Sequence, residues 1–218
     1  MSYDGKFDVH DLYELKILEH VEQTPRLNNR LATQKLGVSL RLAHEVLARM
    51  VRKGLMHVKK QHARRWDYFL TPKGAAAKGR LTVQFLDFSM HFYHEARKRS
   101  AQVCKDLAVA GVRQVAYLGA NELAEICHLG VQEWGLKIVA VYADSPKKTF
   151  LGVPVSPLAD LAKDASDAII VCVYDPALPM AARYLPPGLA PRPTMRWIFA
   201  PAGDQGSVKV RKGLAARV

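Results

Sequence analysis

The residues with the clearest chemistry lie on one face of a helix predicted over residues 39–53. Ser39 follows a glycine turn and is a typical N-cap, because its hydroxyl can accept from the free N–H groups of the first turn. At helical spacing the apolar residues fall on one side, and the other side carries Arg41, His44, Glu45 and Arg49. Guanidinium groups bind guanine edges or phosphates, and His and Glu can read base edges. Such a helix can enter the major groove of double-stranded DNA.

A second basic group lies in the segment 55–70, whose two arms of β-forming residues predict a β-hairpin. This segment contributes Lys59, Lys60, His62, Arg64 and Arg65. Arg64 and Arg65, near the tip, suit contact with the minor groove or the backbone, and the other three suit phosphate contacts. The alternative for each residue is an ordinary solvated charge.

The charge of the chain is concentrated around these two segments. Residues 26–80 hold 14 Lys and Arg but only two acids, an excess that equals the net charge of +12 of the whole 218-residue chain. The remaining sequence is close to neutral. This concentration favours a polyanionic partner over a soluble enzyme with an incidentally high isoelectric point.

Two further helices are predicted before the basic one, over residues 8–23 with Asp8 as N-cap and over residues 28–36. Three helices followed by a basic hairpin is the order of a winged helix-turn-helix. Roughly residues 10–95 resemble the winged helix of MarR-type regulators, particularly those found beside exopolysaccharide gene clusters. Four segments carry this resemblance: 31–32, 36–39, 53–55 and 68–74. It implies a transcription regulator that binds two DNA half-sites as a homodimer.

A long helix is predicted from Thr71, a suitable N-cap, to about Ala110, with a break near residues 79–82 as an alternative. Its aromatic stripe either packs internally or forms a dimer seam, and consists of Phe85, Phe88, Phe92 and Tyr93. We therefore predict four segments: a DNA-binding domain over 1–72, a linker and dimerisation helix over 73–111, an effector-binding domain over 112–202 and a basic tail over 203–218.

Beyond residue 113, apolar strands alternate with helices. Strands are predicted over 115–118, 137–144, 168–173 and 196–199, and helices over 121–134, 156–161 and 177–185, while Val208 and Val210 could add an edge strand. Alternation of this kind predicts a parallel sheet covered on both faces. The predicted fold class is multidomain α/β, with an N-terminal winged helix-turn-helix, a long linker helix and a C-terminal Rossmann-like sheet.

The turn after the first of these strands could hold an anion, because free N–H groups and the helix dipole favour a phosphate there. The turn consists of Gly119, Ala120, Asn121 and Glu122. In the pattern G-x-G-x-x-G/A, Asn121 replaces the second glycine; Asn tolerates a positive φ but adds bulk. Asp144, at the end of the second strand, could bind a ribose hydroxyl.

Residues 113–200 resemble the nucleotide-binding half of the redox-sensing repressor Rex, CoA-binding domains and the N-terminal domain of sugar O-acetyltransferases. The strand, turn and helix just described carry this resemblance, together with a Gly-x-Pro-Val segment within residues 150–158. It implies an effector of nucleotide type, such as NAD(H), a CoA derivative or a nucleotide sugar. The alternative is a Rossmann-like domain kept for dimerisation or docking.

The three cysteines, Cys104, Cys127 and Cys172, are widely separated, which excludes a CxxC zinc ribbon or thioredoxin motif. Cys127 and His128 lie within a predicted helix and no further ligands cluster in sequence, so we expect no metal or haem site; a redox-sensing thiol at Cys127 is a second alternative. Cys172 is expected in the core. An odd cysteine count without a signal peptide predicts a cytoplasmic protein, and no apolar run is long enough to span a membrane.

These observations predict a dimeric, ligand-responsive DNA-binding repressor. No set of catalytic residues stands out, so we predict that the protein is not an enzyme. One alternative is a nucleotide- or CoA-dependent enzyme that carries a winged-helix domain. Another is an adaptor whose winged helix does not bind DNA, although such domains usually lack this concentration of charge.

Overall fold

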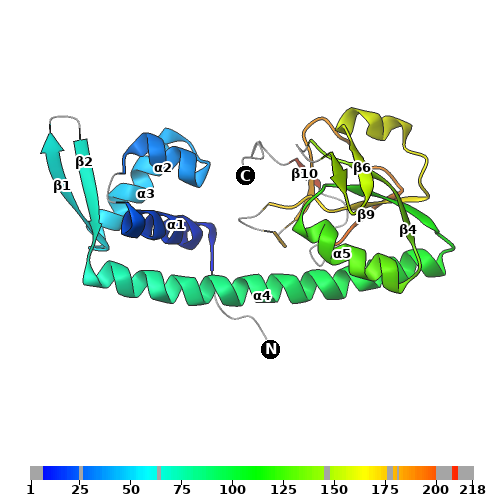
Figure 1. Cartoon of the computed structure of the whole chain (residues 1–218), viewed down its shortest axis with the longest axis horizontal. Coiled ribbons are helices and arrows are strands. Elements are labelled where there is room, and N and C mark those ends of the chain that lie inside the picture. Colours follow the sequence, from blue (N-terminus) through cyan, green and yellow to red (C-terminus); the bar gives the residue numbers. More distant parts are fainter. Residues whose placement is uncertain are drawn as a thin grey trace. The chain divides into compact units, whose positions relative to one another are not determined.

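The structure, a computed structural model, describes residues 7–24, 27–62, 65–144, 148–175, 179–180, 182–199 and 208–210, without the side chains of residues 60–62, 65 and 208–210. The chain forms two compact units, Met1–Met90 and His91–Val218. The boundary between the units falls inside helix α4 (Pro72–Val109), which is labelled in Figure 1.

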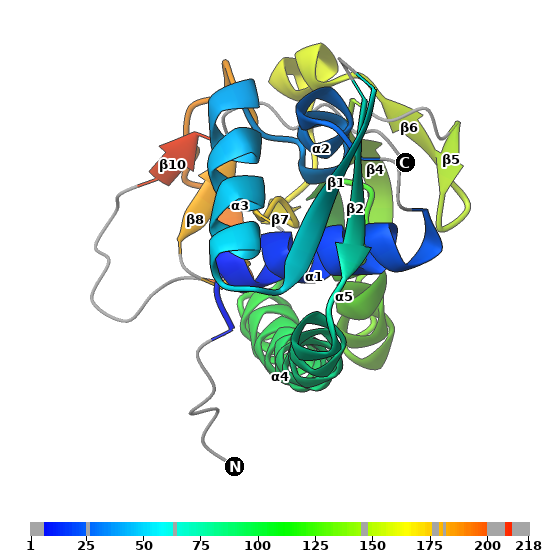
Figure 2. The same ribbon diagram turned by 90° about the vertical axis from the view of Figure 1, so that its left-hand side faces the viewer.

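The first unit begins with α1 (Val9–Gln23), α2 (Asn29–Leu36) and α3 (Leu40–Arg52), and α1 crosses α3 (Figure 2). Oxygens of Asp8, Asn28 and Ser39 accept hydrogen bonds from first-turn N–H groups of the three helices, which confirms the predicted caps at Asp8 and Ser39. Gly37 has a left-handed backbone (φ 66°), which lets α2 end and α3 begin within a tight turn.

One apolar face of each of these helices forms the core of the first unit. On α3 the buried side chains are Ala43, Val46, Leu47 and Met50, which is the face that the sequence predicts. These residues pack against Leu15 and Leu18 of α1 and Ala32 of α2. Burial of this apolar surface fixes which side of α3 remains outside.

The basic hairpin forms as predicted. Strands β1 (Met56–His62) and β2 (Arg65–Leu70) pair antiparallel, with Met56 opposite Leu70 and Lys59 opposite Asp67. The rings of His57 and Phe69 stack across the pair, with centroids 5.3 Å apart. The three helices and this hairpin make a winged helix-turn-helix.

Helix α4 follows β2, and its first turn packs against the turn that joins α3 to β1. The Thr71 hydroxyl donates to the Gly54 carbonyl (2.6 Å) and accepts from the Gly74 N–H (3.0 Å). A Cβ at Gly74 would lie 1.9 Å from the Leu55 carbonyl oxygen, so only glycine allows this close approach. The helix then runs without interruption to Val109, and the alternative of a break near residues 79–82 is wrong.

The N-terminal part of α4 packs on the first unit. Leu81 is fully buried in its core, and the Lys78 ammonium lies 2.6 Å from a Glu22 carboxylate oxygen. Phe7 contacts the rings of Phe85 and Phe88, with centroids 5.7 Å apart in each pair. Two aromatic residues of the predicted stripe are therefore used inside this unit.

The second unit is built on a sheet in the order β5-β6-β4-β3-β7-β9. The strands are β3 (Gln114–Leu118), β4 (Lys137–Tyr142), β5 (Thr149–Phe150), β6 (Val153–Ser156), β7 (Ala168–Val171) and β9 (Met195–Trp197). All described pairings are parallel except that of β5 with β6. From β6 to β9 this is the doubly wound order, whose switch point lies between β3 and β7.

Both faces of this sheet are covered, as the apolar strands predict. On one face Val115 and Tyr117 of β3 pack in a core with α5 (Glu122–Glu133) and with Ala96, Cys104 and Leu107 of α4. On the other face, Ala116 and Leu118 pack with Leu161 of the 3-10 helix η1 (Leu158–Lys163). The end of α4 thus packs in the core of the second unit. The division of the chain into four segments, with a linker and dimerisation helix over 73–111, stays a prediction.

The helix predicted over 177–185 is wrong at its end, where β8 (Arg183–Leu185) forms instead. Tyr184 and Leu185 favour a strand and are buried, and Pro186 follows directly, which disfavours a helix. The predicted strand around Val208 and Val210 exists as β10 (Val208–Val210), which pairs in parallel with β8.

Candidate functional site

The outward face of α3 lies directly opposite its buried face. Successive helical residues are about 100° apart, so Arg41, Glu45, Ala48 and Arg52 lie farthest from the core. The Arg41 side chain is 90% exposed, and its Nε lies 2.9 Å from Glu45 Oε1. An exposed pair of this kind contributes little to stability, so a phosphate or a base can readily displace Glu45 from Arg41.

His44 and Arg49 flank this outward face and have contacts within the first unit. His44 Nδ1 lies 3.1 Å from the Asn29 amide nitrogen, at the start of α2. Arg49 Nε lies 3.3 Å from Glu14 Oε1, on α1, and the Arg49 side chain is 30% exposed. Arg49 therefore holds α3 against α1 in this structure.

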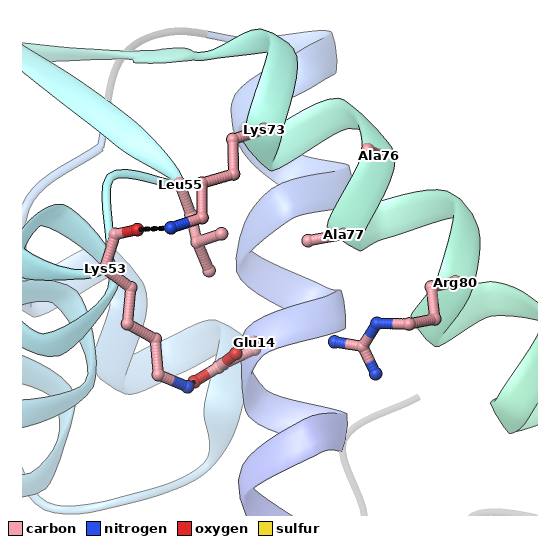
Figure 3. Close-up of a pocket in the computed structure, with 7 residues that line it drawn as sticks. All are labelled: Glu14, Lys53, Leu55, Lys73, Ala76, Ala77 and Arg80. Carbon is pink, nitrogen blue, oxygen red and sulfur yellow. Dashed lines mark hydrogen bonds and ion pairs between the residues drawn. The ribbon is translucent and has the colours of Figure 1, made fainter.

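Glu14 is a buried carboxylate at the centre of a basic cluster (Figure 3). Its Oε1 accepts a hydrogen bond from Lys53 Nζ (2.7 Å), at the end of α3. Lys73 Nζ donates to the Lys53 carbonyl (2.8 Å), and the Arg80 guanidinium points into the same space (Figure 3). A cavity of about 440 Å³ lies here, walled by Leu55, Ala76 and Ala77. Sequence patterns missed Glu14, because a single acid on an amphipathic helix has no spacing signature.

The hairpin lies across a groove from α3. A space of about 550 Å³ is lined by Asn28 and Asn29 of α2, by His44 and Arg52 of α3, and by Trp66 and Tyr68 of β2. Burial raises the pKa of Tyr68. Arg52 is exposed at the rim of this groove and is a candidate DNA contact that the predicted set omits.

The hairpin residues of the predicted DNA-binding set are placed only in part. Lys59 is exposed on β1. Lys60, His62 and Arg65 lie on the two strands, but their side chains are not described, and Arg64 lies outside the described residues. Ser39 serves as the N-cap of α3, with its Oγ 3.3 Å from the Leu42 nitrogen.

The switch point of the second unit is closed by the protein's own hydrogen bonds. Asn121 Oδ1 accepts from the N–H groups of Leu123 and Ala124, and Asn121 Nδ2 donates to the Cys172 carbonyl (2.9 Å), just beyond β7. The Tyr174 hydroxyl donates to Glu122 (3.1 Å) at the start of α5. These bonds join the two sides of the crevice in which doubly wound folds hold ligands.

The predicted anion site is therefore occupied by a side chain. Asn121 has an extended backbone (φ −146°) instead of the positive φ considered from the sequence, because it is the N-cap of α5. A phosphate at this helix start would compete with the side-chain oxygen Oδ1 of Asn121 for the same N–H groups. Position 119, in contrast, requires a glycine. Its φ of 113° is rare for other residues, and a Cβ there would lie 3.3 Å from the Cys172 carbonyl.

The remaining residues predicted to bind a nucleotide, Ala120 and Asp144, each lie two residues after the end of a strand. Ala120 is half-buried between Gly119 and Asn121. Asp144 lies two residues beyond the end of β4 and is exposed. Nearby, burial and a hydrogen bond to Asp164 raise the pKa of Tyr142 to about 12.

In the part of the chain that the structure describes, no helix is long and apolar enough to cross a membrane. Nor do the described residues contain a group of three or more His, Cys, Asp or Glu side chains that could hold a metal ion.

Comparison with known proteins identifies the first unit. A sequence family described as winged helix-turn-helix DNA-binding matches residues 10–55, which span α1 to the turn after α3. No curated protein matches the chain. The winged helix-turn-helix predicted from the sequence is confirmed by this match and by the structure.

Several solved structures are similar to parts of the chain. The PcaV transcriptional regulator from Streptomyces coelicolor is 26% identical over 37% of this chain and 60% of its own, with a TM-score of 0.34. MepR, a transcription regulator of the Staphylococcus aureus multidrug efflux pump MepA, is 17% identical over 47% and 78%, with a TM-score of 0.34. Human N-acetylserotonin methyltransferase is 15% identical over 75% and 65%, with a TM-score of 0.30. The chain spans 60–63% of the length of the first three solved structures.

Proposed function

We propose that this protein is a transcription regulator that binds double-stranded DNA with α3 in the major groove. The observation that carries the proposal is the exposure of Arg41 and Arg52 on the outward face of a winged-helix α3. Both arginines lie in the segment that holds the whole net positive charge of the chain. The two are about three helical turns apart along α3, so they can reach a base edge and the flanking backbone together.

The hairpin supplies the second contact of the proposed interface. Lys59 and the predicted contacts Lys60, His62, Arg64 and Arg65 would meet phosphates beside the major groove that α3 enters. His44 and Glu45 are proposed as base-reading residues, and Arg49 as a residue that positions α3 through Glu14.

The regulator acts as a homodimer in this proposal, through an apolar stripe on α4. Val83, Leu86, Met90 and Tyr93 are spaced by three and four residues, and each side chain is between 42% and 58% exposed. This is the spacing of a helix seam that buries its apolar face against another helix. The seam differs from the aromatic stripe expected from the sequence, since Phe85 and Phe88 contact Phe7, and Phe92 contacts Tyr174 and Phe199.

An effector of this regulator is proposed to bind in the Glu14 cavity. Three cations, Lys53, Lys73 and Arg80, line this cavity, and Leu55, Ala76 and Ala77 make its walls largely apolar. The cavity therefore suits a small organic anion with a hydrophobic body. A carboxylate that competes with Glu14 for Lys53 would change how the end of α3 is held. Binding would then shift the population of α3 arrangements and, by linkage, the affinity for DNA.

A nucleotide effector at the switch point of the second unit is the competing proposal. The doubly wound strand order favours it, whereas the Asn121 cap and its bond to Cys172 oppose it. A thermal-shift series separates the two. The anion proposal predicts stabilisation by aromatic and aliphatic carboxylates but not by their amides, and loss of the effect in Arg80→Gln. The nucleotide proposal predicts stabilisation by NADH, acyl-CoA or a nucleotide sugar that Arg80→Gln leaves intact.

The function itself is tested by fluorescence anisotropy with labelled duplexes at several salt concentrations. Promoter fragments beside the chain's own gene and beside polysaccharide clusters are the first to try, because the sequence resembles regulators of such clusters. We expect binding that weakens steeply with salt. Absence of binding to every duplex at low salt would exclude the proposal.

A further inference from the structure

All three cysteines of the chain meet in the core of the second unit, although they are far apart in sequence. Cys104 lies on α4, Cys127 on α5 and Cys172 directly after β7, and each is fully buried. They belong to the same core cluster as Tyr117. Nothing in the DNA-binding proposal uses them.

A close helix crossing places Cys104 beside Cys127. A Cβ at Gly130 would lie 3.2 Å from the Cys104 sulfur and 3.3 Å from the Ala101 Cα, so α4 and α5 approach as only a glycine permits. Cys127 lies one turn before Gly130 on the same face of α5. The Cys172 thiol, in contrast, donates to its own strand at the Ile170 carbonyl (3.8 Å).

Two buried hydroxyls around these thiols lack partners. Ser100 Oγ and Tyr117 Oη are inaccessible and have no hydrogen-bond partner at ordinary distances in the described part of the chain. Donor groups of Cys104, Cys172, Ser100 and Tyr117 surround the Cys127 thiol and lower the pKa of Cys127, although burial raises it. The neighbouring Cys127 and burial raise the pKa of Cys104. A thiolate at Cys127 would give the Ser100 and Tyr117 hydroxyls the acceptor that they lack.

We propose that Cys127 is an oxidisable thiol and that hydrogen peroxide converts it and Cys104 into a disulfide between α5 and α4. The Cys127 thiolate attacks the peroxide O–O bond, and with one proton it gives a sulfenic acid and water. The Cys104 thiol then attacks the Cys127 sulfur, which forms the S–S bond and releases a second water. Two thiols lose two electrons in total, and one peroxide gains them.

Because the thiols are buried, only a small oxidant can reach Cys127, and only another buried thiol can react with its sulfenic acid. Peroxide is small and neutral and can enter a packed core during brief local openings, whereas glutathione cannot fit there. The sulfenic acid must therefore be resolved by an internal thiol. Cys104 is the better placed of the two, because the Gly130 crossing brings its helix against α5.

The experiment treats the native full-length chain with hydrogen peroxide, quenches it in denaturant with an alkylating agent, and maps peptides without reduction. Free methionine added to the reaction serves as an internal clock, since its sulfoxide marks the total exposure to oxidant. We expect a Cys104–Cys127 disulfide before the free methionine is half oxidised, in the natural chain and in Cys172→Ser. Three free thiols after the free methionine has been oxidised, or a Cys127–Cys172 link, would overturn the proposal.

Tyr117→Phe separates a chemical role of the hydroxyl from a structural one. The variant removes only an unpartnered hydroxyl, so the chain should remain folded, which circular dichroism and thermal unfolding would verify. We expect the disulfide to form about tenfold more slowly, because one donor to the thiolate is lost. An unchanged rate would show that Tyr117 does not activate Cys127. None of these outcomes depends on DNA binding.

Discussion

Glu14 of α1 and Lys53 at the end of α3 are joined by a 2.7 Å hydrogen bond, with the carboxylate buried and the ammonium half-exposed. The same Glu14 oxygen lies 3.3 Å from Arg49. One buried acid therefore fixes the C-terminal half of the recognition helix to the helix beneath it. It also occupies the cavity in which an anionic effector would act.

Glu14→Gln should destabilise the first unit by about 1–3 kcal/mol, because the change leaves Arg49 and Lys53 facing a neutral amide. Chemical denaturation of the full chain measures the loss. Glu19→Gln is the matched control, since Glu19 is exposed on the same helix and should cost less than about 0.5 kcal/mol. Equal stabilities of the two variants would mean that Glu14 does not hold α3.

Two glycines of α4 should respond to alanine in opposite directions. Gly74→Ala would place a Cβ 1.9 Å from the Leu55 carbonyl oxygen, and a clash with backbone should cost several kcal/mol or shift the start of α4. Gly79→Ala meets nothing within 4 Å and should stabilise the helix by about 0.5–1 kcal/mol. Thermal unfolding of the two variants distinguishes this packing from a loosely attached helix, in which both changes would stabilise.

The two bonds of Asn121 can be separated by substitution. Asn121→Ser keeps a capping oxygen but loses the bond to Cys172, and should cost about 1 kcal/mol. Asn121→Ala loses both and should cost about 2–3 kcal/mol in the unfolding of the second unit. If Asn121→Gly gains tight binding of NADH that the natural chain lacks, the crevice is a nucleotide site closed by this residue alone.

Much of this architecture follows from local sequence rules. The caps at Asp8 and Ser39, the left-handed Gly37 and the apolar face of α3 each depend on a few neighbouring residues, so the winged helix-turn-helix could be predicted. The alternating apolar strands predicted the covered parallel sheet in the same way. The helix predicted over 177–185 was wrong at its end, where β8 forms. The strand pairs with β10, which lies more than twenty residues away in the sequence, and a local pattern does not show such a pairing.

The site was harder to predict, because its chemistry depends on partners far apart in sequence. The helical pattern could place Arg49 on a polar face but could not show that Glu14, on another helix, would hold it. The fingerprint around Gly119 suggested a phosphate, whereas only the fold shows the Asn121 amide bonded to Cys172. The convergence of three separated cysteines likewise appears only once α4 and α5 pack together.

A charged side chain introduced into the proposed dimer seam tests whether the seam is buried in a dimer. Leu86→Glu or Met90→Glu places a carboxylate in the proposed interface, where it would be desolvated, and should convert a dimer into a monomer in sedimentation experiments. Lys98→Glu, an exposed charge change elsewhere on α4, should leave the dimer intact. A natural chain that sediments as a monomer at micromolar concentration would contradict the seam.

The most direct test of the central claim is the salt dependence of DNA affinity in the natural chain, in Arg41→Ala with Arg52→Ala, and in Lys163→Ala. Lys163 is an exposed cation of the second unit and serves as the control. The account predicts that the double variant loses about tenfold to a thousandfold in affinity, with a shallower salt slope, while the control binds like the natural chain. Equal affinity and equal slope for all three proteins would show that α3 does not face DNA.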